Sequence, residues 1–173
     1  MKTVNNKYIV AATLVAVWFT SCKKDFLDEN PRTDLIPPTD LKTLRALLDD
    51  DRAMNWTPTL GELSADNYYV TWTYWQTLTF NHEKFSYTWE KDVYQGQQNV
   101  DDWSRSYKQV LNANVALEGL TQIPVLSANR KEWDEVKGNA LFFRANAYYN
   151  LAQIFAPPFD VNTADTDPGL PLR

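Results

Sequence analysis

The 173-residue sequence carries 22 acidic and 17 basic residues, which gives a formal net charge of -5. An acidic chain lacks the basic footprint that nucleic acids require, and it is equally unsuited to bind anionic lipid through charge. Aromatic residues make up 14% of the chain and glycines number only five, so a disordered or low-complexity protein is disfavoured and a packed core is expected.

Residues 1–21 have the pattern of a secretory signal peptide. Lys2 and Lys7 supply a positive start, and residues 8–19 form an apolar run that is shorter than the roughly 20 residues of a transmembrane helix. Small residues, Thr20 and Ser21, then precede the cleavage point. Removing this segment takes away two lysines and no acid, so the net charge of the remaining chain changes from -5 to -7.

Cys22 is the only cysteine, and it follows this segment directly. The stretch from Phe19 to Cys22 resembles the lipobox cut by bacterial lipoprotein signal peptidase, with Phe19 in place of the usual leucine. The alternative is a buried free thiol, which is disfavoured because Lys23 and Lys24 follow and no core surrounds the position. We therefore expect a lipid on Cys22, with more than one acyl chain, to anchor the protein to the membrane.

Residues 22–38 are expected to be the lipidated N-terminus and an extended tether, because they hold three prolines and no helical period. A helix follows, capped by Thr39 or Asp40 and ending near Asp50, with its apolar positions at helical spacing: Leu41, Leu44, Leu47 and Leu48. The acids at 49–51 lack the central glycine and terminal glutamate of a calcium loop, so we expect no metal there.

Residues 55–89 are rich in Trp, Tyr and Phe interleaved with Thr, Asn and Gln, and they show no helical period. We expect irregular loop with short helical turns.

Two long helices are predicted after this aromatic segment. Asp101 is expected to cap the first, whose inward stripe is Trp103, Tyr107, Val110, Asn114, Leu117 and Leu120. Asn129 and Glu132 predict a capping box for the second, which Pro157 and Pro158 end. Its apolar residues fall on two stripes: Trp133, Val136, Ala140, Phe143, Ala147, Leu151 and Ile154, and then Leu141, Ala145, Tyr148, Ala152 and Phe155. Such a helix is expected to lie between neighbours, with Gly138 permitting close approach.

This helix pair looks like a tetratricopeptide unit, which cannot bury its hydrophobic faces alone. Its neighbours would be the helix near residues 41–48 or a part of the chain beyond Arg173. The sequence therefore predicts an all-α fold of tetratricopeptide-like helix pairs with long irregular loops, in which residues 39–173 are the N-terminal part of a truncated domain.

Several motifs occur together in an order and spacing that resemble one known family. They are Ser21-Cys22, Lys24 to Asp28, Trp89 to Tyr94 leading into the helix at Trp103, Gly138 to Ala145, Tyr148 to Leu151, Pro157 to Asp160, and Asp167 to Leu172. The chain resembles the SusD/RagB outer-membrane lipoproteins of Bacteroidota, an all-helical family normally several hundred residues long.

The resemblance implies a protein on the outer membrane that faces outside, where Asp25, Asp28 and Glu29 resemble a surface-export signal. It implies capture of an oligosaccharide, or sometimes a peptide, and delivery to a SusC-type TonB-dependent transporter. The alternative to a ligand-binding protein is a non-catalytic helical scaffold.

Sugar binding needs flat aromatic faces with amides nearby for the hydroxyl groups. The candidate binding residues are Trp72, Tyr74, Trp75, Asn67, Gln76 and Asn81. Core packing is the alternative for each aromatic side chain. It is the preferred interpretation for the aromatics at helical spacing, Trp103, Tyr107, Trp133 and Tyr148, whereas Arg144 is expected to make a structural polar contact.

An enzyme is the disfavoured class. His82 is the only histidine, so a metal cluster built from several histidines is excluded within this chain, and we expect no Ser-His-Asp triad. Glycosidases need only two carboxylates, and no pair among the 22 acids is singled out. We expect no catalytic residue, no metal and no cofactor.

Overall fold

The computed structural model describes residue 38 and residues 40–96 and 100–172. These residues form helices and no strand, which confirms the predicted all-α class. The predicted signal peptide, the lipidation at Cys22 and the tether up to residue 37 lie outside the described residues. The helices are α3 (Leu41–Leu48), α4 (Asp51–Met54), α5 (Leu60–Leu63), α6 (Trp72–Thr77), α7 (Asn81–Tyr87), α8 (Asp101–Thr121) and α9 (Arg130–Phe155).

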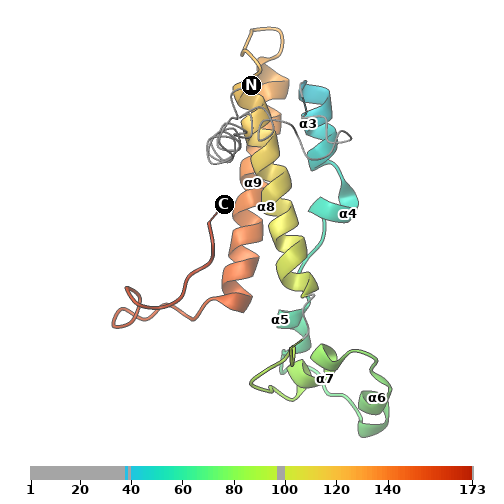
Figure 1. Ribbon diagram of the computed structural model, residues 1–173. Helices are drawn as coiled ribbons and strands as arrows, with labels where there is room; N and C mark the ends of the chain where they lie inside the picture. Colours follow the sequence, from blue (N-terminus) through green and yellow to red (C-terminus); the bar gives the residue numbers. More distant parts are fainter. Residues whose placement is uncertain (1–37, 39, 97–99, 173) are drawn as a thin grey trace, which may run out of the picture. The chain divides into compact units, whose positions relative to one another are not determined.

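The two long helices α8 and α9 lie side by side and are joined by residues 122–129 (Figure 1). Small side chains at their interface allow the backbones to approach, and the predicted apolar stripes are buried at Val110, Leu120, Val136, Ala140, Ala147 and Leu151. Because these residues lose nearly all contact with water, they supply the main hydrophobic stabilisation of the pair.

Helix α3 packs against both long helices, as the predicted neighbour of the pair. The Asp40 carboxylate caps it by accepting a hydrogen bond from the Thr43 backbone N–H at 2.8 Å, and its apolar side, Leu41, Leu44 and Leu48, is buried. Gly119 of α8 faces Leu44, and a Cβ added there would lie 2.7 Å from the nearest leucine methyl. The absence of a side chain at residue 119 therefore sets how closely α3 approaches α8.

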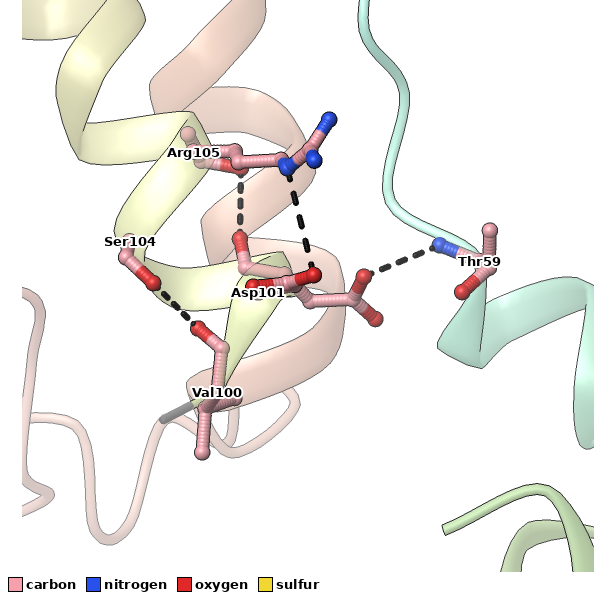
Figure 2. A network of polar contacts seen from close by, with 7 residues as sticks. Thr59, Val100, Asp101, Ser104 and Arg105 are labelled. Atoms are coloured by element: carbon pink, nitrogen blue, oxygen red, sulfur yellow. Dashed lines mark hydrogen bonds and ion pairs between the residues drawn. The ribbon is translucent and has the colours of Figure 1, made fainter. Parts of the chain in front are cut away.

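A buried polar stripe on α8 holds the segment that connects α4 to α5. The Gln109 side-chain amide donates to the carbonyl oxygens of Met54 at 3.1 Å and Trp56 at 2.8 Å. About two turns earlier, the Asp102 carboxylate accepts from the backbone N–H of Thr59 at 3.2 Å (Figure 2) and from that of Leu60 at 3.0 Å. These bonds satisfy the free backbone donors at the start of α5 and fix the segment against α8.

Aromatic contacts and two polar contacts complete the helix packing. Trp103 meets Phe155 edge to face with ring centroids 5.1 Å apart, and Tyr107 meets Tyr148 at 6.3 Å. Trp103 nevertheless keeps 36% of its surface exposed, so its prediction as a core residue holds only in part. Arg144 donates to the Asn114 side-chain oxygen at 3.2 Å, which agrees with the predicted structural contact. Arg45 of α3 pairs with Glu135 of α9 at 2.7 Å.

The predicted cap of α8 is wrong, whereas that of α9 is right in its position but lacks the predicted capping box. The N-cap of α8 is Val100, and Asp101 is already the first helical residue. Asn129 stands at the N-cap of α9 without a side-chain capping bond. Its amide instead accepts from the Leu126 N–H at 2.7 Å and donates to the Pro124 carbonyl at 3.0 Å, because the short preceding loop competes for the same side chain.

The second predicted stripe of α9 is covered only in part by the residues that the structure describes. Leu141 and Ala145 are exposed, as are the adjoining Phe142 and Tyr149. Apart from the adjoining part of α9 itself, no described atom lies within 4 Å of a Cβ added at Gly138, so the expected close approach does not occur there. Among the described helices, none is long and apolar enough to cross a membrane.

Candidate functional site

The aromatic segment contains three short helices, of which α6 and α7 form the candidate site. The Thr71 hydroxyl caps α6 by accepting from the Tyr74 N–H at 3.3 Å. Trp72 and Trp75 are three residues apart and therefore share one face of α6. Their rings are stacked, with centroids 4.9 Å apart and an interplanar angle of 14°. The Lys84 ammonium of α7 lies 5.3 Å from the centre of the Trp75 ring, a cation–π contact that links the two helices.

Both tryptophans line an open cavity of about 460 Å³. The remaining wall consists of Val70, Phe85, Tyr87, Thr88 and Glu90. Trp72 is 67% exposed, so much of its ring is available to a ligand, whereas Trp75 is half-buried. The volume lies within the range of small-molecule pockets, about 300–1,000 Å³, and the walls combine flat apolar surface with a few polar groups.

The polar groups of the cavity differ in how far they are already used. The Tyr87 hydroxyl accepts from the Val70 N–H at 2.9 Å, and the Thr88 hydroxyl donates to the Lys84 carbonyl at 3.1 Å, so both serve the local fold. The buried indole N–H of Trp75 has no hydrogen-bond partner among the described residues. An unpaired buried donor is costly, but because this N–H is closed to solvent, a ligand in the open cavity does not reach it.

The C-terminal end of α7 places Thr88 and Glu90 on the cavity wall. Trp89 has a φ of 56°, the left-handed conformation that usually belongs to glycine. The Glu90 N–H bonds the Phe85 carbonyl at 2.9 Å and the Trp89 N–H bonds the Ser86 carbonyl at 3.2 Å. These are the two bonds of a Schellman motif, which turns the chain sharply between the two wall residues.

Of the six predicted binding residues, the structure brings Trp72 and Trp75 together on the cavity wall. Tyr74 is 61% exposed, and Asn67, Gln76 and Asn81 are exposed, but these four do not line the cavity. Tyr74 differs because residue 74 lies on another face of α6 from residues 72 and 75.

The sequence interpretation missed the other cavity residues. Phe85 and Tyr87 belong to the same aromatic run, which was a usable signal. Val70 and Glu90 carried none, because their place depends on how α6 and α7 fold back on each other.

Titratable groups near this region do not form a metal cluster. Among the described residues, no group of three or more His, Cys, Asp or Glu side chains could hold a metal ion. Burial raises the pKa of Tyr94 to about 12, with a further contribution from the negative charge of Asp102. Tyr94 is therefore neutral at physiological pH.

A family model described as SusD-like, starch-binding and associating with the outer membrane matches residues 25–170. No curated protein and no solved structure matches the chain.

Proposed function

The chain belongs to the SusD-like family, which is described as starch-binding and associated with the outer membrane, and from this premise we propose that it is a surface lipoprotein that captures oligosaccharides. In this proposal the protein delivers the glycan to a SusC-type TonB-dependent transporter. It binds the glycan without cleaving it.

The exposed face of Trp72 above the cavity is the observation that supports glycan capture. A sugar ring presents C–H groups on one side, which pack against the flat, polarisable face of an indole. Trp72 is 67% exposed and is backed by the stacked ring of Trp75 at 4.9 Å, so it offers such a face in a fixed orientation. Holding the ring in place beforehand reduces the entropy that binding would otherwise cost.

Hydroxyl groups of the same sugar need hydrogen-bond partners at the edge of the platform. Glu90 lines the cavity, and a carboxylate accepts hydrogen bonds from sugar hydroxyl groups. The cavity thus combines a stacking surface with a hydrogen-bond acceptor. We propose Trp72, Trp75 and Glu90 as the ligand-contacting residues.

Titration with maltoheptaose tests this assignment. Trp72→Ala is expected to weaken binding about tenfold, equivalent to about 1.4 kcal/mol, with an unchanged melting temperature because the side chain is mostly exposed. Tyr149→Ala is the matched control, since Tyr149 is 63% exposed but stands on α9. Unchanged affinity in the Trp72 variant would remove Trp72 from the site.

The ligand class and the absence of catalysis are tested with the same protein. Binding to short peptides but to no glycan would favour the peptide alternative, and binding only to the transporter would favour a scaffold. Incubation with starch followed by measurement of reducing ends is expected to show no release. Steady release would establish a glycosidase instead.

Membrane attachment is proposed through a lipid on Cys22, which lies outside the described residues. Cys22→Ser is expected to abolish incorporation of labelled palmitate and to release the protein from the outer membrane, because the acyl chains supply the anchoring free energy. Co-purification with a SusC-type transporter encoded beside the gene tests the proposed partner. Failure of the pair to co-purify after cross-linking would contradict the delivery step.

A further inference from the structure

A second cavity lies against α4 and α8, and it shares no wall residue with the cavity at Trp72 and Trp75. It has a volume of about 470 Å³ and is lined by Asp50, Arg52, Ala53, Arg105 and Lys108. Three basic residues and one acidic residue thus line a single open groove in a chain whose net charge is -5. A positive groove on an acidic protein attracts anionic ligands.

The cations of this groove are poorly compensated by the protein. Arg105 reaches Asp101 at 3.9 Å, close to the limit of an ion pair, and both side chains are more than half exposed (Figure 2). Across residues 40–96 and 100–172, no acid lies within 4.0 Å of a charged nitrogen of Arg52 or Lys108. Like charges around one space repel each other, so an anion between them is favoured.

Contacts between α8 and residues 54–56 hold the groove in shape. Arg105 and Lys108 are three residues apart and therefore lie on the same side of α8. The opposite wall is α4, which Gln109 fastens to α8 through the carbonyl oxygens of Met54 and Trp56. The Arg105 guanidinium also lies over the Trp56 ring, 5.6 Å from its centre, which restricts the arginine side chain.

We propose that this groove binds the carboxylate or sulfate group of an acidic saccharide. The two guanidinium groups of Arg52 and Arg105 present paired N–H donors that match the oxygens of such a group, and the Lys108 ammonium adds a point charge. The volume is large enough for a sugar ring that carries the acid, and Asp50 can accept a hydrogen bond from a ring hydroxyl. The saccharide rests on the proposed function, whereas the oxyanion rests on the groove alone.

Calorimetric titration of the full chain with glucuronate, glucose and inorganic sulfate tests the proposal. Glucuronate is expected to bind more tightly than sulfate. Glucose, which carries no acid group, is expected not to bind in the groove. Arg52→Gln and Lys108→Gln are each expected to weaken glucuronate binding about fivefold, and raising the salt concentration should weaken it further. Arg130→Gln is the control, because it removes one exposed positive charge from α9 and Arg130 does not line the groove.

The Arg52→Gln, Lys108→Gln double variant decides the outcome. Wild-type affinity for glucuronate in this variant, or no glucuronate binding to the wild-type protein, would overturn the groove. Sulfate binding as tight as glucuronate binding would overturn the saccharide assignment. Maltoheptaose affinity, measured in parallel, is expected to be unchanged in the double variant, so failure of the groove is distinguished from failure of the Trp72 site.

Discussion

The side-chain amide of Gln109, buried in α8, donates to the main-chain carbonyl of Trp56 at 2.8 Å and to that of Met54 at 3.1 Å. One side chain therefore satisfies two carbonyl groups across 53 residues of sequence. These bonds hold the chain between α4 and α5 in place. They therefore also position α4, which forms one wall of the cationic groove, and the start of the aromatic segment.

Gln109→Leu is expected to lower the free energy of unfolding by about 2–3 kcal/mol, because it leaves two carbonyl groups without a donor. Urea denaturation measures the change, and faster exchange of the Thr59 and Leu60 amide hydrogens would show where the structure loosens. Gln122→Leu is the control, since that amide is exposed and bonds only Thr121. Equal stability of the two variants would mean that water replaces Gln109 at no cost.

The apolar stripes of the helices could be predicted from the sequence, whereas the buried polar stripe of α8 could not. The apolar positions of α3, α8 and α9 are readable from helical spacing, and Val136, Ala140, Ala147 and Leu151 are buried as predicted. The burial of Asp102 and Gln109 was not predicted, because burial of a polar side chain depends on a partner far away in the chain. The capping bond at Asn129 is absent because its side chain bonds the preceding loop instead.

The kinds of residue that form the candidate site could be predicted from the sequence, but most of the individual residues could not. The aromatic run marks the segment that forms the cavity, and Trp72 and Trp75, two of the predicted residues, line it. Glu90 could not be assigned, because its place depends on the left-handed backbone at Trp89, which sequence patterns assign to glycine. The cationic groove was not readable either, since Arg52 and Arg105 meet only when α4 packs on α8.

Gly119→Ala is expected to destabilise the protein by about 1–2 kcal/mol, because its Cβ would meet the fully buried Leu44 at 2.7 Å. Gly138→Ala on α9 provides the opposite case, since a Cβ there meets nothing within 4 Å. Alanine is the better helix former, so this variant is expected to gain up to about 1 kcal/mol. Thermal unfolding of both variants measures the difference, and a shift in the same direction for both would contradict the packing of α3 on α8.

Trp89→Gly is expected to raise stability by about 0.5–1 kcal/mol. An L-residue with a φ of 56° pays a steric cost that glycine avoids, and Trp89 is 71% exposed, so little packing is lost. Trp89→Ala removes the same side chain but keeps the steric cost, so it is expected to show no gain. Equal urea midpoints for the two variants would exclude backbone strain at residue 89.

Tyr94 is expected to make stability depend on pH in the alkaline range. Its pKa is raised from 10.0 to about 12 by burial and by the charge of Asp102, so the folded state favours the neutral phenol. The unfolded chain releases this proton first, and the stabilisation is complete below pH 10 and is lost as the pH rises toward 12. The free energy of unfolding, measured with urea at steps through this window, should therefore fall more steeply with pH for the wild-type protein than for Tyr94→Phe. The variant has no hydroxyl to titrate. Tyr149→Phe, at an exposed position, serves as the control and is expected to follow the wild type. Parallel curves for the wild type and Tyr94→Phe would show that the buried phenol does not govern alkaline unfolding.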